Sequence, residues 1–234
     1  MKITAGLGSI DEYERFVQAG ADEFFCGYVP FSWAEKYGTI MPLNRREVLC
    51  YNVQLGSYSE LEILSHMVKK YKKPVHLTFN SLYYLPEQYP EIGDIIEQCM
   101  ELGFRSYILA DPALPVYLKN RGISCEIHLS GETGEVNSEM VKMFRRFPLK
   151  RIIFHRKNTF QDMQSVITAE RERRKNRQAS GRKRGWNSKL LCSTKCVSLR
   201  GHSAILCTVM RWDIFAGYLT GWVLCLSLIH ISEP

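Results

Sequence analysis

One arrangement of residues recurs three times in the first part of this 234-residue chain. A helix-like segment ends at a glycine or a proline, and a short loop then leads into a run of apolar residues, at 20–28, 103–111 and 147–155. A continuous apolar run that follows a helix terminator is typical of a parallel strand buried on both faces. The repeat therefore predicts an α/β fold in which helices and parallel strands alternate.

The alternation continues to about residue 169 and predicts a domain over residues 1–169. Six strands are expected, near 3–8, 23–26, 74–80, 107–110, 124–129 and 151–154. Six such units make about three-quarters of an eight-stranded β/α barrel of the TIM type. A doubly wound open sheet is the alternative, but Gly6-Leu-Gly8-Ser-Ile-Asp lacks the third glycine of the dinucleotide-binding turn. The sequence therefore favours an incomplete β/α barrel.

The positive charge of the chain is concentrated after this domain. The whole chain has 31 Lys and Arg against 24 Asp and Glu, whereas residues 1–169 have 19 against 20. Net charge therefore does not support a nucleic-acid partner. No apolar run reaches the roughly 18 residues that a membrane span requires, and the first residues lack a signal-peptide layout. We expect a cytoplasmic protein without a membrane partner.

Polar side chains stand at the ends of the predicted strands, where β/α barrels place their working residues. Asn and Asp in such positions also form ordinary turns, and a histidine inside an apolar strand is equally typical of a protein core. The connection over 28–57 is long, and connections of this length are usually functional or mobile. The candidates for substrate binding are Asn80, Asp111, His128, Ser130, Glu132, Asn137 and His155.

Neither the G-x-S-x-G nor the H-E-x-x-H motif occurs, so the catalytic residues stay unknown and no metal site is predicted. Four cysteines of the predicted barrel, Cys26, Cys50, Cys99 and Cys125, are widely spaced and lie mostly in apolar runs. This spacing is typical of single buried thiols rather than of a disulfide scaffold.

The ordered set of features over residues 1 to about 169 resembles peptidase family U32, the collagenase-like peptidases. The resemblance rests on Val17-Gln-Ala-Gly-Ala-Asp-Glu-Phe-Phe-Cys-Gly27, Asn80, Ala110-Asp-Pro112, and Ile127-His-Leu-Ser130 followed by Asn137. It implies a barrel-like N-terminal domain and hydrolysis of peptide bonds. For several members it also implies an iron–sulfur centre with four cysteines from later in the chain, and hydroxylation or maturation of RNA or quinone. The substrate, whether peptide, RNA or a quinone-type small molecule, stays open.

The regular pattern stops at Ala169. The last nine residues, Leu226-Ser-Leu-Ile-His-Ile-Ser-Glu-Pro234, are what one frame of a common transposase-type sequencing adapter encodes. Read one nucleotide earlier, permitted codons for 201–219 give G-A-F-C-N-S-L-H-C-D-E-M-G-H-I-C-R-V-P, which resembles the cysteine-bearing region of the family. We therefore interpret 170–225 as a frameshifted segment that forms no domain and is disordered, and 226–234 as adapter-encoded residues.

Under this interpretation the later cysteines Cys192, Cys196, Cys207 and Cys225 have an accidental spacing and no metal role. The chain as translated is then expected to hold no cofactor, whereas an intact relative would hold a four-iron–four-sulfur cluster. Because about two strands are missing, an inactive fragment is a third expectation beside the peptidase and the iron–sulfur enzyme.

Overall fold

The computed structural model describes residues 2–38, 40–45, 54–155, 157–179, 191–198 and 205–211. Six strands form one parallel sheet in the order β1-β2-β3-β4-β5-β6, so each strand pairs with the next one along the chain. A doubly wound sheet instead reverses its strand order at a switch point. The observed order confirms the predicted α/β fold with six parallel strands arranged as part of a barrel wall.

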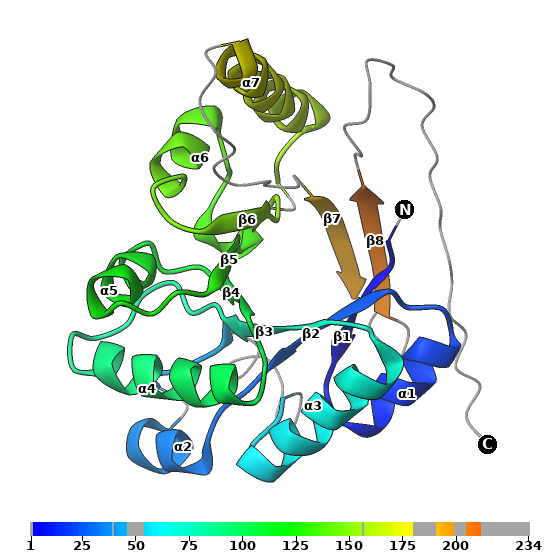
Figure 1. Ribbon diagram of the computed structural model, residues 1–234, viewed down its shortest axis with the longest axis vertical. Coiled ribbons are helices and arrows are strands. Elements are labelled where there is room, and N and C mark those ends of the chain that lie inside the picture. The colour runs from blue at the N-terminus through cyan, green and yellow to red at the C-terminus, as the bar shows by residue number, and fades with distance from the viewer. Residues whose placement is uncertain are drawn as a thin grey trace.

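Helices alternate with the strands and lie around the outside of the curved sheet (Figure 1). The strands are β1 (Thr4–Leu7), β2 (Glu23–Gly27), β3 (Val75–Phe79), β4 (Ser106–Leu109), β5 (Glu126–Leu129) and β6 (Leu149–Ile152). The helices are α1 (Asp11–Gln18), α2 (Phe31–Tyr37), α3 (Tyr58–Tyr71), α4 (Gln88–Glu101), α5 (Ala113–Arg121), α6 (Ser138–Phe144) and α7 (Phe160–Ala179), with the short 3-10 helix η2 (Gly131–Thr133). Helix α2 lies inside the connection that the sequence pattern left without an element.

The glycines of the recurring pattern end helices in the structure. Gly20 follows α1 with a φ of 95°, and Gly103 follows α4 with a φ of 99°. Only glycine adopts such positive φ values at little cost, which is why it is common just after a helix. The pattern was thus informative because it marks the points where each helix must stop and the chain turns back into the sheet.

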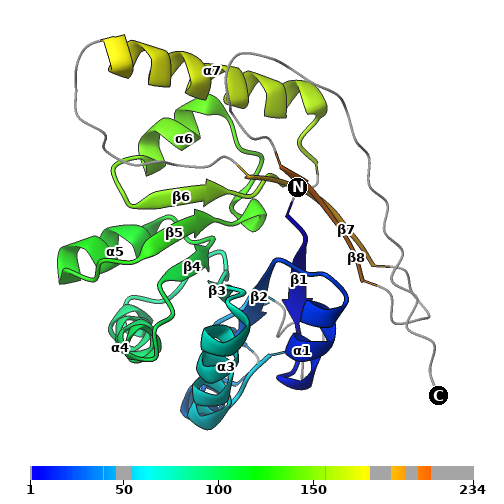
Figure 2. The ribbon, with the colours of Figure 1, turned by 45° about the vertical axis from the view of Figure 1, so that its right-hand side comes forward.

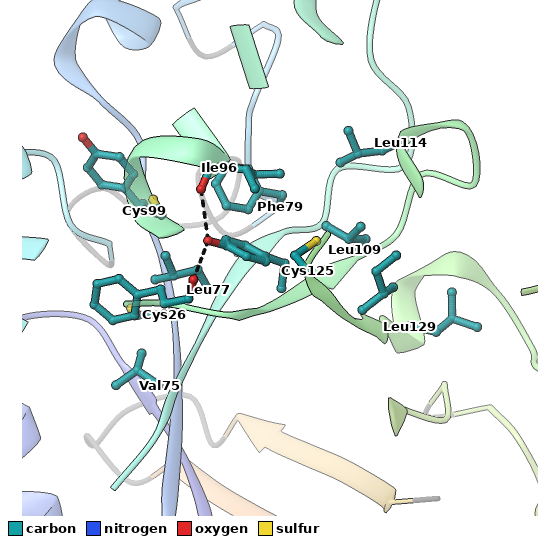
Figure 3. Packing of buried hydrophobic residues seen from close by; sticks show 14 of the residues in the cluster. Cys26, Val75, Leu77, Phe79, Ile96, Cys99, Leu109, Leu114, Cys125 and Leu129 are labelled. Carbon is teal, nitrogen blue, oxygen red and sulfur yellow. Dashed lines mark hydrogen bonds between the residues drawn. The ribbon is translucent and has the colours of Figure 1, made fainter. Parts of the chain in front are cut away.

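Alternate strand residues face the helices and form the main hydrophobic core. Leu77, Phe79, Leu109 and Leu129 gather there with Ile96 of α4 (Figure 3). The hydroxyl of Tyr107 on β4 donates to the carbonyl of Ile96, 3.2 Å away, and to that of Phe104 at 2.9 Å. These contacts attach α4 firmly to the sheet, because a buried hydroxyl that lacks a partner is costly.

Cys26, Cys99 and Cys125 are buried among these core side chains, as the sequence predicts. Burial raises the pKa of Cys125 to about 12 and raises that of Cys99 well above its usual range. Cys99 and Cys125 are therefore neutral core thiols at pH 7. Cys50 lies outside the described residues.

Helix α7 carries ordered packing past residue 169. Glu170, the first residue beyond the predicted break, is only 1% exposed. Its carboxylate forms ion pairs with Arg145 at the end of α6 and with Arg173 one turn further along α7. Helix α7 therefore continues past Ala169 to Ala179 on mostly polar residues.

Two further strands, β7 (Leu191–Ser198) and β8 (Ile205–Arg211), pair antiparallel as a separate two-stranded sheet. Strand β7 contacts β6 and β8 contacts β1, so this hairpin lies between the two edges of the parallel sheet (Figure 2). A complete β/α barrel has eight parallel strands. Within the described ranges the parallel sheet thus has six strands. The frameshift interpretation of 170–225 remains a prediction. The adapter-like residues 226–234 lie outside the described part.

Candidate functional site

Arg45 brings two of the predicted site residues together at the carboxyl end of the sheet. The side-chain oxygen Oδ1 of Asn80, just after β3, accepts a hydrogen bond from the backbone N–H of Arg45 at 3.1 Å. Nε of Arg45 lies 3.0 Å from Oε2 of Glu132, which follows β5. The Arg45 and Glu132 side chains are 44% and 40% exposed, so both charges are open to a ligand.

The segment that carries Arg45 is held against the sheet by neighbouring side chains. The hydroxyl of Thr78 on β3 donates to Oδ1 of the buried Asn44 at 2.5 Å. Tyr84 donates to the carbonyl of Leu43 at 2.8 Å, and the indole of Trp33 on α2 donates to that of Met41 at 3.1 Å. Sequence reasoning did not name Arg45, and the unusual length of the connection was the one signal for this region.

Gly27, the last residue of β2, is needed where this segment meets the sheet. A Cβ atom at this position would lie 2.6 Å from Oε1 of Gln54 and 2.7 Å from Nδ2 of Asn44. We expect Gly27→Ala to displace the Asn44 segment and to lower the free energy of unfolding by about 1–3 kcal/mol. Urea denaturation followed by circular dichroism measures this change, and an unaltered midpoint would show that the segment has room for a methyl group.

Three other predicted residues make local hydrogen bonds at loop and helix starts. Asp111 accepts from the Ala113 N–H at 2.8 Å and from the hydroxyl of Tyr89 at 2.6 Å. Ser130 accepts from the N–H of Glu132 at 3.1 Å, and Asn137 caps α6 by accepting from the Met140 N–H at 2.9 Å. The Ser130 bond shapes the turn that presents Glu132 to Arg45. Substrate contact by these three residues stays a prediction.

His155 lies after β6, where its ring Nδ1 accepts from the backbone N–H of Lys157 at 3.3 Å and its backbone N–H donates to Oδ1 of Asn158 at 3.1 Å. The hydrogen bonds of the described residues do not join it to Asn80, Asp111 or His128. His155 nevertheless lies beside the turn of Ser130 and Glu132, because a Cβ atom at Gly131 would be 3.3 Å from Cα of His155, and its part in binding stays a prediction.

His128 on β5 points to the face of the sheet that lies opposite the helices. It is 2% exposed, its ring centroid lies 4.5 Å from that of His76 on β3, and its Nδ1 has no hydrogen-bond partner among the described residues. Burial, followed by the charges of His76 and Arg151, lowers its pKa well below the usual range. His128 is therefore a neutral buried imidazole at pH 7.

A buried ion pair crosses this interior face from β2 to β6. The guanidinium of Arg151 donates two hydrogen bonds to the carboxylate of Glu23, at 2.6 and 3.0 Å, and Thr4 donates a third at 2.8 Å. The Glu23 side chain is 1% exposed and that of Arg151 is 12% exposed. Burial alone would raise the pKa of Glu23, but the two hydrogen bonds and the positive charge of Arg151 outweigh burial and lower it.

His76 links this pair to Ser106 on β4, because its Nδ1 lies 2.6 Å from the Ser106 hydroxyl. Ser106, His76 and Glu23 have the composition of a nucleophile relay. However, Nε2 of His76 is 3.8 Å from Glu23, which is too long for a hydrogen bond, and Arg151 already occupies that carboxylate. The group also lies at the amino-terminal half of the strands, where β/α barrels keep structural residues. We assign it to the stability of the barrel.

The described residues do not form a set of metal ligands for a cofactor. No group of three or more His, Cys, Asp or Glu side chains is placed there to hold a metal ion. The described cysteines Cys26, Cys99 and Cys125 belong to no such group and lie among core side chains. The helices of the described residues are also too short or too polar to cross a membrane.

The U32 peptidase Mk0906 has a similar solved structure, with a TM-score of 0.52 at 14% identity, covering 72% of this chain. This chain covers only 65% of that structure's length. A glycerophosphodiester phosphodiesterase from Parabacteroides distasonis aligns with a TM-score of 0.43 at 14% identity, over 84% of this chain and 85% of its own.

No curated protein matched the sequence. A family model, in contrast, covers most of the barrel described above, and its match ends within α7, beyond Glu170. That model is peptidase family U32, it matches residues 8–177, and the chain belongs to this family.

Proposed function

We propose that this chain is the barrel portion of a U32 hydrolase and that its carboxyl edge binds a peptide substrate. The observation that carries the proposal is the exposed Arg45–Glu132 ion pair beside Asn80. A guanidinium donates to peptide carbonyls or a terminal carboxylate, and a carboxylate accepts from peptide N–H groups. Its position at the carboxyl edge of the sheet supports the same reading, since β/α barrels carry their substrate sites there.

We place no catalytic nucleophile at this edge and infer that cleavage requires residues beyond the described ones. The chain covers 65% of the length of the U32 peptidase structure, which supports this inference. The chain as translated is therefore expected to bind a peptide without hydrolysing it. We propose the cytoplasm as its compartment.

Arg45→Gln tests the binding role. We expect it to weaken the affinity for a short peptide by about tenfold or more, because a hydrogen bond to a charged group is lost. The free energy of unfolding is expected to change by less than about 1 kcal/mol, since the ion pair is exposed. Lys142→Gln is the matched control, because Lys142 forms an exposed pair with Glu139 on α6 at 3.1 Å. Equal affinities for both variants would contradict the proposal.

Gelatin cleavage separates binding from catalysis. The 234-residue chain and the protein from a gene whose frame is restored over 170–225 are compared side by side. We expect cleavage by the restored protein alone. Cleavage by the 234-residue chain would show that its catalytic site is complete, and a restored protein that leaves gelatin intact would reject the peptidase assignment.

An iron–sulfur enzyme that hydroxylates or matures RNA or quinone is the second candidate. It is favoured by the cysteines in the alternate reading frame of 201–219, which resemble the cysteine-bearing region of the family. The described cysteines supply no cluster site, so any cluster would depend on those later residues. Visible absorbance of the restored protein after anaerobic reconstitution is the discriminating measurement, and a colourless protein that cleaves gelatin would reject this candidate.

A further inference from the structure

A pocket of about 270 Å³ lies beside the Arg45 site, between the segment that precedes Arg45 and the loop that follows β3. Its wall is mostly apolar and comes from 40–42 and 81–83, with Arg45 and Gln88 completing the lining. The hydroxyl of Ser81 donates to the carbonyl of Pro42 and joins the two segments. The pocket is therefore built from two connected loops at the carboxyl edge of the sheet.

The rim of the pocket exposes large apolar side chains. Ile40 is 86% exposed, Tyr83 is 70% exposed and Leu82 is 43% exposed. Apolar groups that gather around a concave surface in this way are typical of binding sites. Among the described residues of the lining Arg45 alone is charged, and Glu132 already pairs with it, so an apolar group fits the pocket better than a charged one.

Gln88, the first residue of α4, supplies a polar group with an unused donor. It is 1% exposed, and its Oε1 accepts from the backbone N–H of Leu85 at 2.8 Å. This bond fixes the orientation of the amide, because Oε1 must face the Leu85 N–H. Nε2 then has no hydrogen-bond partner among the described residues. A buried amide donor without an acceptor is costly, and a ligand oxygen would remove that cost.

We propose that this pocket is a subsite for one apolar side chain of a peptide and that Gln88 donates to a carbonyl oxygen of the same residue. The inference rests on the proposed peptide binding at the neighbouring Arg45 site. A volume of about 270 Å³ is sufficient for one apolar side chain and lies just below the range of about 300–1,000 Å³ found for drug-sized ligands. The subsite thus selects Leu, Ile, Phe or Met over Gly, Asp or Lys.

The test uses the 234-residue chain and two blocked peptides, acetyl-Gly-Leu-Gly-amide and acetyl-Gly-Gly-Gly-amide, with affinities measured by NMR titration. We expect the leucine peptide to bind about tenfold tighter or more, because its side chain is buried. Gln88→Glu keeps an oxygen for the Leu85 N–H but removes the unpartnered Nε2 donor, and it should weaken the leucine peptide about tenfold. The glycine peptide should be little affected.

Ile40→Ser provides a variant that leaves the fold intact, because Ile40 is highly exposed. It should also weaken the leucine peptide, whereas the matched Ile63→Ser on α3, with Ile63 51% exposed and outside the pocket, should not. Equal affinity of the two peptides, or leucine binding that survives both pocket variants, overturns the subsite. Selective leucine binding without gelatin cleavage by the restored protein would keep the subsite and reject the peptidase function.

Discussion

The Arg151→Met variant is expected to lose about 3–5 kcal/mol of its free energy of unfolding. The substitution leaves the Glu23 carboxylate, 1% exposed, without the two hydrogen bonds that Arg151 donates. Thr4 and Lys2, whose Nζ lies 3.5 Å from Oε2 of Glu23, still contact the carboxylate. Losing a buried guanidinium nevertheless costs far more than losing an exposed one, because water cannot replace it. Urea denaturation at pH 7 measures the difference.

Two comparisons isolate the buried pair as the cause. Lys150→Met removes the neighbouring cation, whose partner Glu126 lies 2.9 Å away with both side chains more than 40% exposed, and should cost less than about 1 kcal/mol. The double variant Glu23→Gln, Arg151→Met leaves no buried charge and should recover most of the loss. Equal losses in Arg151→Met and Lys150→Met would show that Glu23 does not depend on Arg151.

The order and number of the parallel strands could be predicted because their signals are local. Gly20 and Gly103 end helices through positive φ values, and each is followed within a few residues by an apolar strand. The limit of the barrel was harder to predict, because α7 continues on polar residues. Glu170 is held by Arg145, a partner 25 residues away, and apolar periodicity does not reveal such a contact.

The candidate site was predicted in part for the same reason. Asn80 and Glu132 follow strands, as the barrel architecture requires, but their link through Arg45 depends on a long connection whose path is set by tertiary contacts. The pair Glu23–Arg151 spans 128 positions and depends on the curvature of the whole sheet. A single sequence identifies which residues end strands, but it does not reveal which distant side chains the curvature brings together.

The free energy of unfolding is also expected to fall as the pH is lowered from 7 to 5. Burial, the largest cause, lowers the pKa of both His76 and His128 in the folded protein, and the charge of Arg151 acts in the same direction. In the unfolded chain these groups return to a pKa of about 6.5. Below that pH the unfolded state binds more protons than the folded state, so stability is lost on acidification. Each histidine contributes up to about 1.4 kcal/mol per pH unit.

His128→Leu identifies the source of this pH dependence. The variant should reduce the slope of unfolding free energy against pH by up to about 1.4 kcal/mol per unit. It should cost little at pH 7, because Nδ1 of His128 has no described partner to lose. The lowered pKa of Glu23 adds a similar loss only below about pH 4.3, outside this window. If His128→Leu does not alter the slope, the imidazole of His128 has the same protonation in the folded and unfolded states, and this explanation is wrong.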